Sequence, residues 1–173
     1  LDFNLASDSE SLSGTISYND PNYNFLGNSI NYYVSSKEND KPESGYENTV
    51  VAAGIGTAFE QYKNIYTDLS LSASYDDLRT LDSASDNLKK QSGNFSDLTG
   101  AYGIKYDTRN RSFRPTDGSI IYFNQELPIY ADKQSISNSL SVSKYNALSE
   151  NAVLGSKFLI STITGVGDDD VRL

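Results

Sequence analysis

The sequence predicts an all-β fold of antiparallel, up-and-down strands of the kind found in transmembrane β-barrels. Along most of its 173 residues, apolar and small polar residues alternate, which gives each strand one apolar and one polar face. The alternating segments number about eight, and each is roughly 9 to 14 residues long, enough to cross a bilayer at a tilt. No apolar run approaches the ~20 residues of a membrane-spanning helix. A chain of this length accommodates one domain.

The first half of the chain contains four of these segments, separated by polar turns. They occupy residues 11–18, 29–35, 46–59 and 65–75. One face of residues 46–59 carries small residues, including Gly54 and Gly56, which predicts a crowded interior or a close approach by another part of the chain. Proline, asparagine and glycine within residues 20–28 predict a turn, and residues 37–45 predict a charged loop.

The second half contains four more alternating segments. They occupy residues 98–107, 119–129, 135–143 and 153–166. Serine stands at every odd position from 135 to 143, which predicts a regular polar face. Residues 77–96 are rich in serine, aspartate, asparagine and lysine and lack the alternation. We expect them to form the longest loop, a functional or mobile surface segment.

The composition excludes several classes of function. The chain has no cysteine and no histidine, so a disulfide framework, a thiolate or imidazole metal site and a histidine-based catalytic triad are all absent. Its net charge of −9 argues against a nucleic-acid partner. The run Asp168, Asp169 and Asp170 lacks the alternating ligands and distal glutamate of a calcium-binding loop. We expect no enzymatic activity, no catalytic residue, no cofactor and no metal.

Alternation by itself leaves two architectures open, because an apolar strand face suits either lipid or a protein core. The first is a membrane barrel, and the second is a water-soluble β-sandwich or barrel. Tyrosines near strand ends favour the first, since they match an interfacial aromatic belt. They are Tyr18, Tyr75, Tyr106, Tyr122 and Tyr145. Brief turns expected on one side of the sheet and longer loops on the other favour it too.

Residues 106–119, YDTRNRSFRPTDGS, combine a turn with two charges. Pro115 fixes φ and cannot donate to a strand ladder, while Asp117-Gly118 favours a left-handed turn, so a reversal between strands is predicted. Asp107 and Arg109 lie two residues apart on the face expected to line the interior. Opposite charges there either pair with each other or join a larger network. They either hold the interior together or help to seat another segment.

This segment resembles the strand-turn-strand signature of the Omp85 superfamily of outer-membrane barrels, and in particular of its assembly factors. Residues 16–34, ISYNDPNYNFLGNSINYYV, are similar to a further strand-turn-strand unit of the same family. The resemblance implies seven signature positions, none of them catalytic. They are Asp107, Arg109, Asn110, Pro115, Thr116, Asp117 and Gly118.

The resemblance also implies that residues 1–173 are part of an outer-membrane β-barrel domain. They would supply the fourth to eleventh strands of a barrel of about sixteen, with residues 1–7 as the end of the third. We expect periplasmic POTRA domains before residue 1, a lumen loop carrying Arg-Gly-Phe after Asp170, and the closing strands elsewhere. The protein would be integral to the outer membrane of a Gram-negative bacterium.

The function implied by the resemblance is to assist the folding and insertion of other β-barrel proteins. Such a barrel opens a lateral seam, templates an incoming strand edge and thins the nearby bilayer. Expected partners are outer-membrane lipid, unfolded outer-membrane proteins and, through the periplasmic domains, accessory assembly lipoproteins. The alternatives are a polypeptide-secreting transporter of the same superfamily, a passive pore or structural barrel, and a soluble β-domain that binds through residues 77–96.

Overall fold

The computed structural model describes residues 1–167, and these form one antiparallel sheet of nine strands in sequence order. The strands are β1 Asp2–Ser7, β2 Ser11–Asp20, β3 Ser29–Lys41, β4 Tyr46–Tyr62, β5 Ile65–Thr80, β6 Gly93–Asp107, β7 Gly118–Ala131, β8 Ser135–Ser149 and β9 Ala152–Gly165. One short helix, α1 Asp86–Lys89, lies between β5 and β6. The all-β, up-and-down prediction is confirmed. β1 joins the eight predicted strands, because it pairs with β2 along its whole length.

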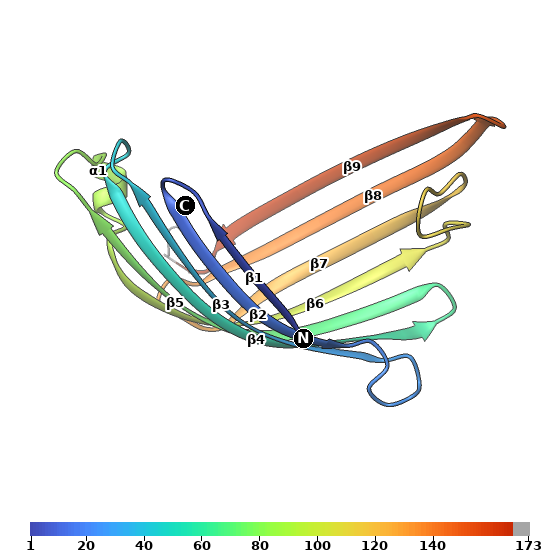
Figure 1. Ribbon diagram of the computed structural model, residues 1–173, viewed down its shortest axis with the longest axis horizontal. Coiled ribbons are helices and arrows are strands. Elements are labelled where there is room, and N and C mark those ends of the chain that lie inside the picture. Colours follow the sequence, from blue (N-terminus) through green and yellow to red (C-terminus); the bar gives the residue numbers. More distant parts are fainter. Residues whose placement is uncertain (168–173) are drawn as a thin grey trace.

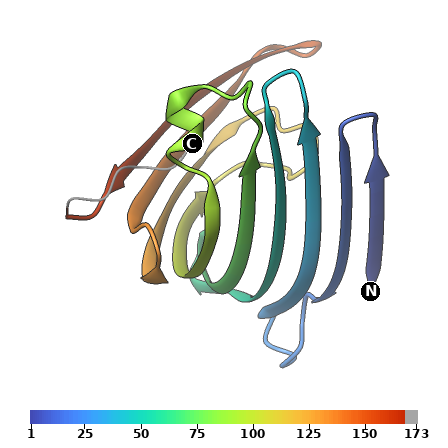
Figure 2. The same ribbon diagram turned by 90° about the vertical axis from the view of Figure 1, so that its left-hand side faces the viewer.

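The sheet curves into an open trough, with β1 along one edge and β9 along the other (Figures 1 and 2). Strand pairing carries the alternation of the sequence across the whole sheet. Ile55 lies between Tyr32 and Leu71 on the convex face, while the next residue, Gly56, lies between Asn31 and Ser70 on the concave face. Since paired residues project to the same side, one register produces an apolar convex face and a polar concave face.

The apolar residues of the convex face do not form a protein core. Within residues 1–167 the buried hydrophobic residues are only Leu78 and Ala84, whereas large side chains such as Ile16, Val34 and Leu71 are exposed. In a β-sandwich this face would pack against a second sheet. The sandwich interpretation is therefore wrong for this chain, because a single layer of strands leaves the whole apolar face uncovered.

Glycines on the concave face lie beneath larger side chains from neighbouring strands. The ring of Tyr33 covers Gly54, where an added Cβ would lie 2.8 Å from Cζ of the tyrosine. The side chain of Asn31 covers Gly56 in the same way. The sequence prediction of a close approach at these two glycines is confirmed, since a Cβ at either position would require the covering side chain to move.

The loop predicted for residues 77–96 is shorter than expected. β5 continues to Thr80 and β6 already begins at Gly93, because Leu78 pairs with Gly93 and extends the ladder. Residues 81–92 fold onto the turn between β3 and β4, where the amide of Leu81 donates to the carbonyl of Gly45 at 2.8 Å. Ala84 is only 6% exposed there. The charged loop predicted for residues 37–45 shrinks in the same way, since β3 extends to Lys41.

The connections are not sorted by length between the two ends of the sheet. The end that we call the first rim carries residues 8–10, 42–45, 81–92 and 132–134, and the second rim carries residues 21–28, 63–64, 108–117 and 150–151. Each rim thus combines short and long connections, so the expectation of brief turns on one side and long loops on the other is wrong. Chain reversals alternate between the rims, but nothing in the backbone geometry ties length to one rim.

Three of the five tyrosines assigned to an interfacial aromatic belt lie on the convex face, and two do not. Tyr18, Tyr75 and Tyr106 lie on the convex face and are exposed. Tyr122 and Tyr145 belong to the polar parity of β7 and β8 and lie on the concave face. Assigning these two to a lipid interface was wrong, because proximity to a strand end does not determine the face on which a residue lies.

We expect Gly54→Ala to lower the free energy of unfolding of the full-length protein by about 1–3 kcal/mol, because the new methyl group displaces the ring of Tyr33. Urea unfolding in detergent measures this. Gly14→Ala is the matched control, since its Cβ would lie 3.8 Å from Leu5 in ordinary contact. Equal effects of the two substitutions would contradict the packing argument.

Candidate functional site

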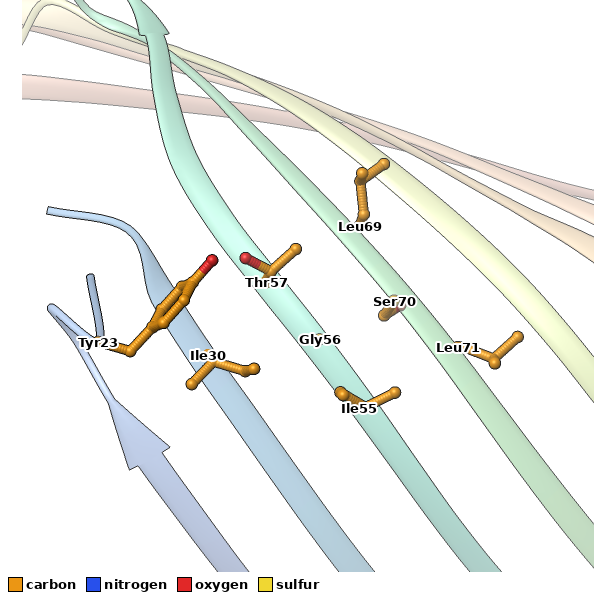
Figure 3. A pocket seen from close by; sticks show the side chains of 8 residues that line it. All are labelled: Tyr23, Ile30, Ile55, Gly56, Thr57, Leu69, Ser70 and Leu71. Carbon is orange, nitrogen blue, oxygen red and sulfur yellow. The ribbon is translucent and has the colours of Figure 1, made fainter. Parts of the chain in front are cut away.

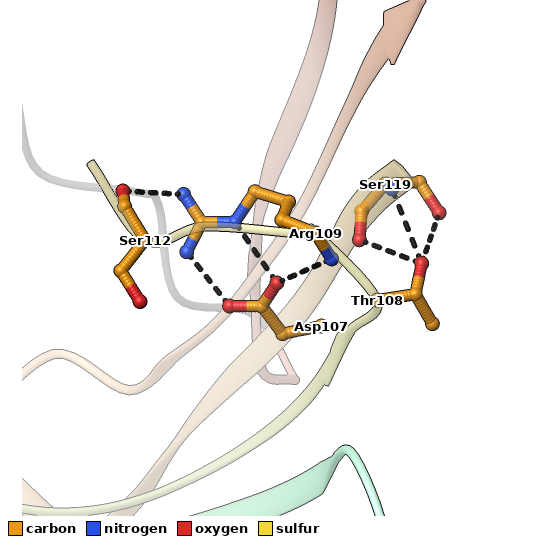
Figure 4. A network of polar contacts seen from close by, with 5 residues as sticks. All are labelled: Asp107, Thr108, Arg109, Ser112 and Ser119. Carbon is orange, nitrogen blue, oxygen red and sulfur yellow. Dashed lines mark hydrogen bonds and ion pairs between the residues drawn. The ribbon is translucent and has the colours of Figure 1, made fainter. Parts of the chain in front are cut away.

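Residues 106–119 form an ordered hairpin connection at the second rim. β6 ends at Asp107 and β7 begins at Gly118, but the ladder continues into the loop. The amide of Thr108 donates to the carbonyl of Ser119 at 2.8 Å, and the amide of Asn110 donates to that of Asp117 at 3.1 Å. The hydroxyl of Thr108 also accepts from the amide of Ser119 at 3.1 Å (Figure 4). The predicted reversal is therefore present, with two backbone bonds beyond the strand ends.

Asp107 and Arg109 form a two-pronged ion pair at the base of this loop (Figure 4). Nη2 of the arginine lies 2.7 Å from Oδ2 of the aspartate, and Nε donates to Oδ1 at 2.9 Å. The side chains are 19% and 18% exposed, which limits solvent screening. Hydrogen bonding to Asp107 raises the pKa of the Arg109 guanidinium above its ordinary value. Of the two arrangements left open by the sequence, the charges adopt direct pairing.

The side chain of Asn110 ties the two halves of the loop together. Its oxygen accepts from the amides of Thr116 at 3.1 Å and Asp117 at 3.3 Å, and its nitrogen donates to the hydroxyl of Thr116 at 2.7 Å. Pro115 has no amide to offer, so Thr116 supplies the first amide after it. Asn110 thereby satisfies amides that no strand partner reaches.

Gly118 is required by the backbone conformation of the loop. Its φ is +97°, and an added Cβ would collide with the carbonyl oxygen of Thr108 and lie 2.8 Å from Cα of Arg109. The structure thus brings all seven signature residues into one connection: an ion pair, an asparagine clamp and two turn-forming residues. Their contacts hold a defined loop shape, and the arrangement contains no nucleophile next to a base.

Polar groups that are far apart in sequence also meet on the concave face. The hydroxyl of Tyr122 donates to Asp68 at 3.2 Å, and Gly103 lies beneath both side chains, where no Cβ would fit. The ammonium group of Lys105 lies 4.6 Å from the centre of the Tyr66 ring. These contacts link β5, β6 and β7 from within and satisfy charges that face the interior.

A hydrogen-bonded ladder on the convex face was not anticipated. Tyr102 donates to Gln125 at 3.1 Å, and Gln125 in turn donates to Asn138 at 2.5 Å. The only signal in the sequence is that Gln125 and Asn138 interrupt the apolar parity of their strands. Side-chain amides on an apolar face are costly unless they bond to each other, which these do.

No metal-binding cluster is found in the part of the chain that the structure describes. Residues 1–167 contain no cluster of three or more acidic, histidine or cysteine side chains able to hold a metal ion. Asp168, Asp169 and Asp170 lie outside the described residues. Within residues 1–167, no helix is both long and apolar enough to cross a membrane.

The sheet and its connections define a class of protein: a section of a large, up-and-down antiparallel β-barrel of the transmembrane type, with an apolar outside and a polar inside. The Omp85 superfamily domain matches residues 1–173. The chain therefore belongs to the Omp85 superfamily, as the signature segment predicted.

One solved structure similar to this chain is the crystal structure of BamA from Haemophilus ducreyi lacking POTRA domains 1–3. The TM-score is 0.81 at 19% sequence identity, so the similarity is one of fold. The match covers 98% of this chain and 36% of that one, so the chain spans about a third of the length of the BamA chain. No curated protein matches the sequence.

We expect Arg109→Ala to lower the free energy of unfolding by about 1–3 kcal/mol, because it leaves the half-buried carboxylate of Asp107 without its two charged donors. Arg109→Lys should recover only part of this, since an ammonium group lacks the planar fork. Arg111→Ala, at an exposed position of the same loop, is the control. A double-mutant cycle with Asp107→Ala, measured in urea, would refute the pairing if it gave no coupling energy.

Gly118→Ala should destabilise the hairpin through both backbone strain and collision with Thr108. The strain of a positive φ costs about 1–3 kcal/mol, and the collision adds to it. Gly27→Ala separates the two effects, because Gly27 has a φ of +80° with no neighbour within 4 Å of an added Cβ. The fraction of protein that migrates as the heat-resistant folded form should therefore fall further for Gly118→Ala. If Gly27→Ala is at least as harmful, the collision is unimportant.

Proposed function

We propose that the chain is the middle part of an outer-membrane barrel that assists the folding and insertion of other β-barrel proteins. The observation that carries this is the membership of all 173 residues in the Omp85 superfamily, together with a sheet similar to that of BamA. In this proposal, residues 1–173 supply about nine strands of a barrel of about sixteen. Domains beyond residues 1–173 would bind accessory lipoproteins.

The two faces of the sheet support a position within a membrane. The convex face offers a mostly apolar surface to lipid, interrupted by the hydrogen-bonded ladder of Tyr102, Gln125 and Asn138, and the concave face offers serines, glycines and paired charges to a water-filled interior. β4, with 17 residues, exceeds the ~9–11 residues needed to cross the hydrocarbon core. The excess lies toward the first rim, where Glu38, Asp40 and Asp77 put charge on the convex face.

In the proposed function, the protein makes and breaks no covalent bond. Unfolded outer-membrane proteins are the substrates, and their exposed strand edges are what an open barrel seam would pair with. The signature loop at residues 108–117 acts as a rigid connection that fixes β6 against β7. Its residues support the barrel and do not contact a reacting group.

Depletion of the full-length protein in its native host tests the proposal. We expect the heat-resistant folded forms of several unrelated outer-membrane barrels to decrease together, because each depends on assisted insertion. Quantitative electrophoresis of unheated membranes measures this. If those barrels persist while one secreted polypeptide is lost from the medium, the protein is a secretion transporter. If Arg109→Ala protein at normal folded levels restores the assembly of other barrels in the depleted host, the ion pair has a structural role in supporting the barrel.

A further inference from the structure

Residues 21–28, the connection between β2 and β3, hold two large apolar side chains out from the second rim. Phe25 is 90% exposed and Leu26 is 80% exposed. The connection is nevertheless ordered: the amide of Tyr23 donates to the carbonyl of Asn28 at 3.1 Å, and the side chain of Asn22 accepts from the amide of Gly27 at 2.7 Å. These bonds fix the path of the backbone while the two apolar side chains stay outside it.

The backbone conformation at Phe25 adds a second unfavourable feature to the exposure of its side chain. Its φ is +60°, which is unusual for a bulky residue and costs free energy. Exposure of a phenylalanine and a leucine to water is unfavourable as well. Neither cost is offset by contacts within residues 1–167 that bury these two side chains. An apolar environment outside the chain would offset both.

The connection lies on the convex side of the sheet. It projects away from the trough in both views (Figures 1 and 2). Tyr23 borders a groove of about 390 Å³ on the convex face, and the other large side chains around this groove come from β3, β4 and β5 (Figure 3). They are Ile30, Ile55, Leu69 and Leu71. The remaining lining residues are Gly56, Thr57 and Ser70, so the groove contains no charged side chain.

Beside residues 21–28, the apolar surface of the convex face comes closer to the second rim than to the first. Tyr18, Ile30 and Ile65 carry it almost to the strand ends, and Asp20, the last residue of β2, is the charged residue between them and the connection. At the first rim the same face carries several charges, among them Glu38, Asp40 and Asp77. The boundary of a bilayer therefore falls close to the second rim, at the level of Phe25 and Leu26.

We propose that Phe25 and Leu26 insert into the adjacent lipid leaflet and that an acyl chain of a membrane phospholipid occupies the groove beneath Tyr23. The inference rests on the proposed membrane position of the barrel and names the lipid contact of one particular connection. Continuity with the lipid-facing surface and the absence of charge in the groove select an acyl chain as the occupant. The inserted side chains displace lipid locally, as an interfacial anchor does.

Fluorescence quenching in vesicles tests the insertion. These 173 residues contain no cysteine, so a single cysteine can be placed at Phe25 of the full-length protein. The variant is labelled there with an environment-sensitive nitrobenzoxadiazole. It is then reconstituted into vesicles of phosphatidylethanolamine and phosphatidylglycerol. We expect blue-shifted emission and several-fold stronger quenching by doxyl-labelled phospholipid than for the label at Glu43→Cys on the first rim. A label at Leu69→Cys, on the convex face, reports separately whether the barrel lies in the bilayer.

The outcomes distinguish the inference from the function on which it rests. Quenching at position 69 without quenching at position 25 overturns the insertion and leaves the membrane barrel intact. Blue-shifted emission at position 25 without lipid quenching also overturns it, since a protein segment then covers the connection. Loss of quenching at both positions contradicts the membrane barrel itself.

A second measurement addresses the groove. Ile55→Phe fills it from the floor, and Val51→Phe places the same aromatic ring on the same face of β4 outside the groove. Electron spin resonance of spin-labelled phosphatidylglycerol counts motionally restricted lipids per protein. We expect Ile55→Phe to remove restricted lipid relative to Val51→Phe at equal folded yield. Equal counts for the two variants would refute the acyl-chain site.

Discussion

The whole structure depends on the register of antiparallel hydrogen bonds across nine strands. Side chains alternate with a period of two, so a slip of one residue along a whole strand pair would exchange the apolar and polar faces of every strand beyond it. The ladder avoids this from β1 to β9, because its three register shifts, at Glu60/Tyr62, Leu98/Thr99 and Ala147/Ser149, lie toward the ends of their strand pairs. Both the lipid-facing surface and the polar interior follow from this register.

Packing on the concave face reinforces the register at particular points. Tyr33 over Gly54, and Asp68 with Tyr122 over Gly103, each require one strand to sit at one position relative to its neighbour. A shift by two residues would keep the faces correct but would place Asp68 opposite Ala101 or Lys105, each of which carries a Cβ, and in one direction would place Tyr33 opposite Ala52. The glycines therefore act as local markers of alignment in a sheet that has no conventional hydrophobic core.

The two rims differ in their exposed apolar and charged residues, and this difference connects the fold to the proposed function. The second rim carries the rigid signature loop and the exposed Phe25 and Leu26, with Asp20 and Lys144 on the convex face of its strand ends, while the first rim carries a larger group of charges on that face, including Glu38, Asp40 and Asp77. A barrel placed in a bilayer would therefore meet the two leaflets asymmetrically. That asymmetry arises from where the apolar band stops along each strand, and not from the lengths of the connections.

The sequence by itself determined the strands, their two faces, the reversal at Pro115 to Gly118 and the family, because these are encoded over short distances by alternation and turn chemistry. The tertiary structure decided which residues meet: Asp68 with Tyr122, Gln125 with Asn138, and Gly45 with the connection that contains Ala84. It also turned Phe25 and Leu26 outward, whereas the alternation of β7 and β8 already assigns Tyr122 and Tyr145 to the polar face. Such contacts depend on interstrand register and loop packing, which join residues far apart in the chain and leave no local pattern.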